Sequence, residues 1–203
     1  MRRHFALLAF LIAVRISAAE FVSQASILTP VTLELQSDQY ATSFSNSATG
    51  MPAVAIGLAV PVLRTGGCIF SLQTNVGYRY KQGTYAVKAG DEARPLQPIT
   101  LHWVPMSLAT KLTYDFSGVP FVRPTLIAGV GAQWLHLSGD LPGDTRSFWT
   151  PFAYVSPAIT ILEGRSEDDW FGGFSFGTTY YQSFASPQRI SGLSLDLTLN
   201  ILL

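Results

Sequence analysis

Near its C-terminus the chain alternates between apolar and polar side chains from Leu193 to Ile201. Apolar residues occupy every second position from Leu193 to Leu203, and polar residues such as Ser194, Asp196 and Thr198 fill the gaps. Successive side chains of a β-strand point to opposite faces, so a period of two predicts a strand with one apolar and one polar face. Such a strand must turn its apolar face either to a protein core or to lipid.

Seven further segments show the same alternation, and clusters of Gly, Pro, Asp, Asn and Ser separate them. Such clusters are typical of turns. Together with the last segment they predict an all-β protein of eight strands. The approximate ranges of the eight are 31–36, 54–62, 70–80, 104–114, 123–134, 148–162, 174–183 and 193–203.

The composition favours lipid over a protein core for the apolar face. Of the 203 residues, 48% are hydrophobic and only 13% are charged, whereas soluble domains carry about 25% charged residues. The polar rows consist mainly of Gly, Ala, Ser, Thr, Asn and Gln, which suit the crowded interior of an eight-stranded barrel. A face in water is normally rich in charge. We therefore predict an eight-stranded antiparallel up-and-down transmembrane β-barrel with its apolar residues outward.

The N-terminus has the pattern of a secretory signal peptide. Two arginines precede the apolar stretch FALLAFLIAV, and small residues follow it up to Ala19. We expect cleavage after Ala19, so that residues 1–19 are a signal peptide and residues 20–203 form one barrel domain. Cys68 is the single cysteine of the sequence, so the chain has no pair for an intramolecular disulfide.

The connections predict which strand ends lie together. Consecutive turns of an up-and-down barrel lie at opposite ends, and in outer-membrane barrels the short turns gather at one end and the long loops at the other. Aromatic residues near both ends of the strands are typical of membrane-interface belts. The short turns lie near 64–67, 115–120 and 163–169, and the longer loops near 37–50, 82–96, 137–147 and 185–189.

Five charged residues fall on the polar faces of the strands. We predict that they meet across the lumen as hydrogen-bonded ion pairs, because an eight-stranded barrel is just wide enough for side chains to fill it. The alternative is a set of isolated charges at strand ends in contact with water. The five are Glu34, Arg79, Lys111, Arg123 and Asp196. A lumen filled in this way is not expected to conduct freely.

The signal peptide, the segment PFVRPTLIAGVGAQWL and the alternating terminal strand together resemble the small eight-stranded outer-membrane barrels of the OmpA, OmpW and OmpX kind. The resemblance covers about residues 20–203. It implies a place in the outer membrane of a Gram-negative bacterium, contact with outer-membrane lipids and lipopolysaccharide, and insertion by the barrel-assembly machinery. The glycines of AGVGA are expected to make room in a narrow lumen. Such barrels commonly end in an aromatic residue, whereas this chain ends in Leu203.

These features predict a structural or surface-interaction role, with no enzymatic activity, cofactor or metal. A nucleic-acid partner is not expected, because 13 acidic residues balance 13 basic ones. One alternative is a barrel that binds or passes small apolar molecules through a lateral opening, as is proposed for OmpW-like members. Pro105, Pro151 and Pro157 would mark that opening, because proline removes a ladder hydrogen bond. A soluble lipocalin-like binder is a further alternative.

A last alternative is an enzyme that modifies lipid A. His136 and Ser138 lie two residues apart and so share one face of a strand, the face predicted to meet lipid. Lipid A deacylases built on eight-stranded barrels resemble this arrangement, with a membrane-facing His-x-Ser and a supporting Glu. No carboxylate downstream of Ser138 has the place that the resemblance requires, so an interface histidine beside a loop serine is the favoured interpretation.

Overall fold

The computed structural model describes residues 20–28, 32–35, 40–43, 51–89, 92–93, 97–116, 119, 121–139, 147–161, 171–184 and 188–202. These residues form β-strands and connecting turns. In the described ranges, no helix is long and apolar enough to cross a membrane. The predicted signal peptide lies outside the described residues.

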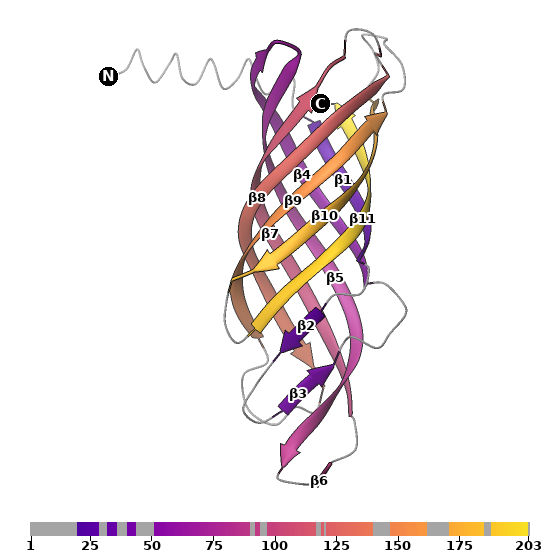
Figure 1. Ribbon diagram of the computed structural model, residues 1–203. Coiled ribbons are helices and arrows are strands. Elements are labelled where there is room, and N and C mark those ends of the chain that lie inside the picture. Colours follow the sequence, from indigo (N-terminus) through magenta and orange to yellow (C-terminus); the bar gives the residue numbers. More distant parts are fainter. Residues whose placement is uncertain are drawn as a thin grey trace, which may run out of the picture.

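Eight long strands form a closed antiparallel barrel (Figure 1). β1 pairs with both β4 and β11, which closes the ring. Closure matters in lipid, because each backbone group left unpaired at an open edge costs several kcal/mol. In ring order the strands are β1 (Glu20–Leu28), β4 (Met51–Thr65), β5 (Cys68–Ala89), β7 (Gln97–Tyr114), β8 (Val122–Ser138), β9 (Ser147–Ile161), β10 (Phe171–Ser183) and β11 (Gln188–Leu202).

The first barrel strand lies earlier in the chain than predicted. β1 begins at Glu20, whereas the segment predicted as the first strand is the short β2 (Thr32–Leu35), which pairs with residues 188–191 of β11 beyond the ring. The alternation in β1 is weak, since Val22 turns inward while Ser23 takes an outward position. Pairing with β4 and β11 determines the place of this strand more than its own pattern does.

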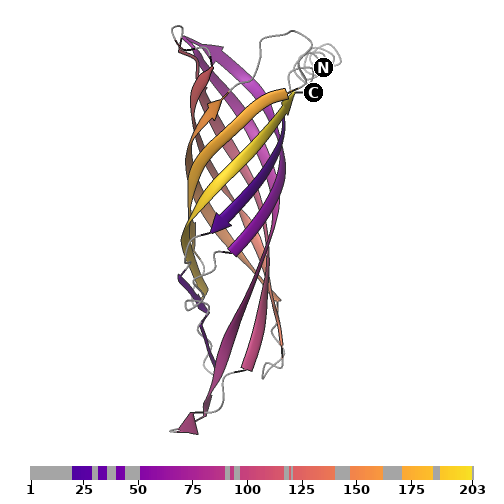
Figure 2. The same ribbon diagram turned by 90° about the vertical axis from the view of Figure 1, so that its right-hand side faces the viewer.

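One end of the barrel continues into a projecting sheet. β3 (Tyr40–Ser43) and β6 (Glu92–Ala93) both pair with the far part of β5, which together with β7 extends past the barrel wall (Figure 2). We call this the loop end, and the opposite end, which holds the start of β1 and the finish of β11, the termini end. The turns assigned to each end are as predicted, but the length contrast is weaker because β5, β7 and β8 run into the predicted loops.

The outward direction of the apolar residues is confirmed. In β11, Leu195 and Leu197 are 56% and 44% exposed, whereas Ser194 and Asp196 between and beside them are buried. In the same way, β4 turns its valine and isoleucine side chains outward and its small alanines inward. The large exposed apolar side chains form the outer surface of the ring strands β4, β5 and β7 to β11. The barrel therefore turns its apolar side chains outward and its polar ones inward, as barrels in a lipid bilayer do.

Candidate functional site in the barrel lumen

The barrel encloses a cavity that all eight ring strands line. The gaps between its lining side chains add up to about 830 Å³, a figure that includes space open to solvent. Small residues of β4 and β5, such as Ala55 and Gly77, leave room on one side of it. Three of the five charged residues predicted to face the lumen line this cavity, namely Arg79, Lys111 and Asp196. All three are buried.

Arg79 is held by aromatic rings. Its guanidinium carbon lies 4.6 Å from the ring centroid of Trp103 and 4.2 Å from that of Tyr181, which are distances of cation–π contacts. One terminal nitrogen donates a hydrogen bond to the Tyr181 hydroxyl. The other, Nη1, is buried and makes no hydrogen bond to the residues that the structure describes. The guanidinium group of Arg79 therefore contacts two aromatic rings, and its Nη1 donates no hydrogen bond to a described residue.

The rings around Arg79 belong to an aromatic layer that fills the lumen toward the loop end. Tyr181 lies 5.8 Å from Tyr154 and 6.3 Å from Phe152 between ring centroids, and it meets Trp103 edge-on at 6.1 Å. The Tyr154 hydroxyl accepts hydrogen bonds from Asn75 at 3.0 Å and from Ser107 at 3.3 Å. We define the aromatic layer as Trp103, Phe152, Tyr154 and Tyr181.

Buried apolar side chains fill the inner face beyond the aromatic layer, nearer the loop end. Neither the aromatic layer nor this apolar row was predicted from the sequence, because only small polar residues were expected inside. The signal was nevertheless present as a second apolar row: in β7 and β8 the inward positions are apolar near the loop end, as the outward ones are. The members of this row are Ile99, Leu101, Leu135 and Leu137, each no more than 2% exposed.

Asp196 is held by hydroxyl groups. Thr179 on the neighbouring strand β10 donates to one carboxylate oxygen, and Ser194 donates to the other at 2.9 Å. Hydrogen bonds of this kind fix the position of the carboxylate. Asp196 lines the same cavity as Arg79.

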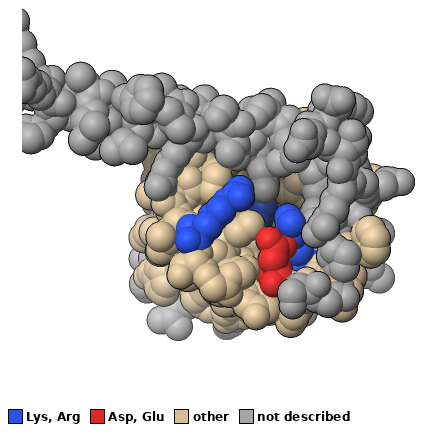
Figure 3. Space-filling model, turned by 90° about the horizontal axis from the view of Figure 1, so that it is seen from above, with Lys and Arg blue, Asp and Glu red and all other residues tan. Residues whose placement is uncertain are grey.

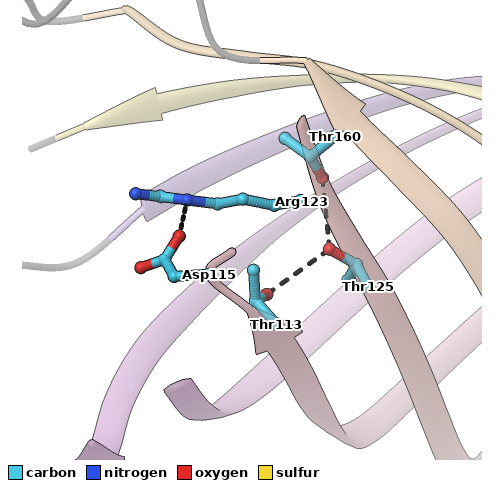
Figure 4. Close-up of polar contacts among 5 residues, drawn as sticks. All are labelled: Thr113, Asp115, Arg123, Thr125 and Thr160. Atoms are coloured by element: carbon cyan, nitrogen blue, oxygen red, sulfur yellow. Dashed lines mark hydrogen bonds and ion pairs between the residues drawn. The ribbon is translucent and has the colours of Figure 1, made fainter. Parts of the chain in front are cut away.

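The remaining predicted residues lie elsewhere. Arg123 forms an ion pair with Asp115 at the termini end, where both side chains are partly exposed (Figure 4). Viewed from this end, basic side chains gather beside an acidic group at the opening of the barrel (Figure 3). Glu34 falls in β2, outside the ring, and its side chain lies outside the described part of the chain. The five-residue network as a whole remains a prediction.

A chain of hydrogen bonds crosses the inner wall near the termini end. It links five successive strands, from β7 to β11, through hydroxyl groups and one amide, and its part on β7, β8 and β9 is drawn in Figure 4. The links are Thr113 to Thr125 at 3.4 Å, Thr125 to Thr160 at 3.2 Å, Thr160 to Ser175 at 2.8 Å and Asn200 to Ser175 at 3.0 Å. We call these five residues the hydroxyl chain. Their burial shows that side chains pack against the wall at this level.

His102 and His136 lie on the outer surface. His136 makes a 2.7 Å hydrogen bond with Ser147 on β9, so its hydroxyl partner is Ser147 and not Ser138, which the lipid A alternative would require. His102 is hydrogen-bonded to the Tyr78 hydroxyl at 2.8 Å, and the two imidazole rings are 5.9 Å apart. Among the described residues, no group of three or more His, Cys, Asp or Glu is placed to hold a metal ion.

Two of the three prolines of interest coincide with breaks in strand pairing. The β5–β7 ladder lacks the pairs opposite Val104 and Pro105, and the β9–β10 ladder lacks those opposite Ser156 and Pro157. Pairing resumes in register on both sides of each break. Pro151 lies in β9 with its pairing to β8 intact. The breaks are therefore local features of a continuous wall.

A closed eight-stranded ring, an apolar outer surface and a polar, packed lumen together define a transmembrane β-barrel of the outer-membrane type. No protein-family model matches the sequence, and no curated protein matches it significantly. Solved structures similar to this chain include Neisserial surface protein A (NspA), with 13% sequence identity and a TM-score of 0.49 over 91% of this chain and 97% of that one.

Two further similar structures are Ail, the attachment invasion locus protein of Yersinia pestis, and the outer membrane protein OprG of Pseudomonas aeruginosa. Ail has 8% identity and a TM-score of 0.48, and the match covers 91% of this chain and 99% of Ail. OprG has 10% identity and a TM-score of 0.40, with 92% and 94% covered. The class assignment rests on the ring and its sidedness, which this chain shows by itself.

Proposed function

We propose that this protein is an integral outer-membrane barrel with a structural or surface-interaction role, and that it is not a large pore. The observation that carries the proposal is the packed lumen. The aromatic layer with Arg79 fills it toward the loop end, and the hydroxyl chain lines it near the termini end. Side chains that pack across a barrel stiffen it and leave no wide aqueous path.

The proposed orientation places the loop end outside the cell. Outer-membrane barrels have short periplasmic turns and longer extracellular loops. The tight two-residue turn Gly66–Gly67 lies at the termini end, and its positive φ angles of 54° and 79° are those that glycine adopts readily. The β5–β7 extension, with β3 and β6 beside it, is then the surface that meets other cells or ligands.

Outer-membrane lipids and lipopolysaccharide are the proposed partners of the outer surface, and the barrel-assembly machinery is the proposed route of insertion. Tyr78, Tyr80 and Trp149 are exposed on the outer face in the half of the barrel nearer the loop end. Tyrosine and tryptophan are enriched at membrane interfaces because one end of the ring is apolar and the other polar. This group therefore suits the headgroup level.

Membrane fractionation and planar-bilayer recording test the proposal. Expressed in a Gram-negative host, the protein should sediment with the outer membrane and migrate differently on a gel before and after boiling, because the folded barrel resists detergent. Reconstituted in a bilayer, it should give no large, steady conductance. A soluble periplasmic fraction would contradict the membrane assignment, and a persistent ohmic current would contradict the packed lumen.

The binding or passage of small apolar molecules is a second candidate, and the break in the β5–β7 ladder favours it. A cysteine pair at Tyr78 and Val104, introduced into a Cys68→Ser background, would bridge the two strands at that break. If apolar molecules enter there, uptake of a fluorescent apolar probe into the barrel should fall on oxidation and recover on reduction. Uptake that is equal in both states would reject lateral entry.

We also propose that the protein is not an enzyme. The His136–Ser147 pair has no carboxylate partner among the described residues, and a serine nucleophile needs a base that a third group orients. Replacing His136 with Ala should leave the lipid A species of the host unchanged by mass spectrometry. A new or missing acyl chain that depends on His136 would contradict this proposal.

A further inference from the structure

The buried guanidinium of Arg79 forms no direct ion pair with a carboxylate of the described residues, although Asp196 lines the same cavity. The side chain is 3% exposed, and a guanidinium stays protonated in any protein environment. Buried charges are normally paired, because the loss of hydration is not recovered otherwise. The contacts of Arg79 are two aromatic rings and one phenol oxygen, and none of these carries a negative charge.

The unused side of the guanidinium fork is oriented by its neighbours. The Tyr181 hydroxyl accepts a hydrogen bond from one terminal nitrogen, and the rings of Trp103 and Tyr181 both contact the guanidinium group. Nη1 is left without a partner in the described part of the chain, and Arg79 lines the luminal cavity. An oxyanion such as a carboxylate or a phosphate is the natural partner of such a fork, because two of its oxygens match the spacing of the guanidinium donors.

We propose that the lumen of this barrel holds a small oxyanion, a carboxylate or a phosphate, at the guanidinium of Arg79. The anion occupies the cavity on the side of Arg79 away from the Tyr181 hydroxyl, and Lys111 lines the same cavity. Asp196 also lines it, and its negative charge, which Thr179 and Ser194 hold in place, opposes the anion and limits its affinity. This site goes beyond the structural role proposed above.

Fluorescence quenching of Trp103 tests the site with iodide as the probe. The full chain is refolded in detergent micelles with Trp134, Trp149 and Trp170 replaced by Phe, so that the ring in contact with Arg79 is the single tryptophan. Acrylamide, a neutral quencher, should act weakly, because Trp103 is only 1% exposed. Iodide should quench more strongly than acrylamide and should saturate. Equal or weaker quenching by iodide would overturn the proposal.

Competition identifies the class of anion. Sodium acetate and sodium phosphate, each compared with sodium chloride at the same ionic strength, should displace iodide and restore the fluorescence. Stronger displacement by acetate assigns a carboxylate ligand, and stronger displacement by phosphate assigns a phosphate ligand. If neither oxyanion displaces iodide better than chloride does, an oxyanion site is ruled out.

Two substitutions and a control separate this site from general charge effects. Arg79→Gln should weaken iodide binding by at least about tenfold, and Asp196→Asn should strengthen it. Arg64→Gln, which removes an exposed arginine at the β4–β5 turn, should leave it unchanged. An Arg79→Gln barrel that still shifts on boiling and binds iodide normally would overturn the proposal. If that variant does not fold, the comparison of iodide with acrylamide on the parent barrel still decides.

Discussion

Tyr180 and Tyr181 on β10 show that a shift of one position along a strand moves a side chain from the outer face to the lumen. Tyr180 is exposed on the outer face, where the alternating pattern predicted it, and its hydroxyl donates to Gln182. Tyr181 is buried in the lumen and accepts a hydrogen bond from Arg79 across the barrel. The sequence predicts that Arg79 faces inward, but not which residue meets it. That partner is 102 residues away, and only the curvature of the closed ring brings it near.

Tyr181→Phe is predicted to destabilise the barrel by about 1.5–3 kcal/mol, the usual range for a hydrogen bond to a charged group. The ring, and with it the cation–π contact, remains. Tyr180→Phe is the matched control, since it removes a hydroxyl from an exposed side chain on the same strand, and it should change the free energy of unfolding by less than about 0.5 kcal/mol. Urea unfolding in lipid vesicles measures both. Equal effects would show that the Arg79–Tyr181 bond contributes nothing specific.

The glycines of β8 make room in the lumen, as the AGVGA segment predicts. A Cβ at Gly129 would lie 2.6 Å from the Tyr154 ring and 2.8 Å from the Cβ of Ala109, and one at Gly131 would lie 2.0 Å from the backbone oxygen of Met106. The nearest contact of Gly129 is thus a ring that can move, whereas that of Gly131 is backbone, which can move only with the sheet. The two positions therefore differ in what a methyl group would displace.

Gly131→Ala is accordingly predicted to be the more harmful of the two substitutions, with a loss of at least the 1–3 kcal/mol or so that is typical of overpacking. Gly129→Ala should cost less, because a side chain can yield. Ala132→Val, on the outer face next to Gly131, should be tolerated. The fraction that shifts on boiling after refolding gives the ranking. A Gly131→Ala barrel that folds as well as the parent would contradict the close approach of β7.

At the scale of the strands, periodicity predicts most of the ring but not all of it. Seven of the predicted segments fall on the ring strands β4, β5 and β7 to β11, and two of them extend one residue past the strand end. β1 was missed because its apolar and polar residues do not alternate cleanly, and its place depends on hydrogen bonds to two partners far away in sequence. Likewise, small polar residues predict an inward face, but not that four hydroxyls and one amide on five strands join in one chain.

Thr160→Val tests the hydroxyl chain at its centre. The change keeps the shape of the side chain and removes the hydroxyl that links Thr125 and Ser175. We predict a loss of about 1–3 kcal/mol, because two buried hydroxyls lose a partner. Thr110→Val, on the outer face of β7, is the matched control and should be neutral or stabilising in lipid. Equal unfolding curves for the two variants would show that the chain does not contribute to stability.

At the scale of the whole molecule, the sequence predicts the class better than the interior. The antiparallel order of the strands and the outward direction of their apolar residues follow from alternation and composition, because every outward position meets lipid. The predicted number of eight is correct, although the first strand was expected at 31–36 and is β1. The inward positions meet no such uniform environment. Contacts between opposite walls produce the aromatic layer, the environment of Arg79 and the cavity. These contacts depend on the register and tilt of all eight strands together.

The central claim is that apolar side chains face lipid and polar ones face the lumen, and spin labelling of β11 tests it most directly. Single cysteines at 194, 195, 196 and 197, in a Cys68→Ser background, carry nitroxide labels in lipid vesicles. Labels at 195 and 197 should collide freely with oxygen dissolved in the acyl chains, whereas labels at 194 and 196 should be immobile and shielded from it. Oxygen contact at 194 and 196, with packed labels at 195 and 197, would contradict the structure.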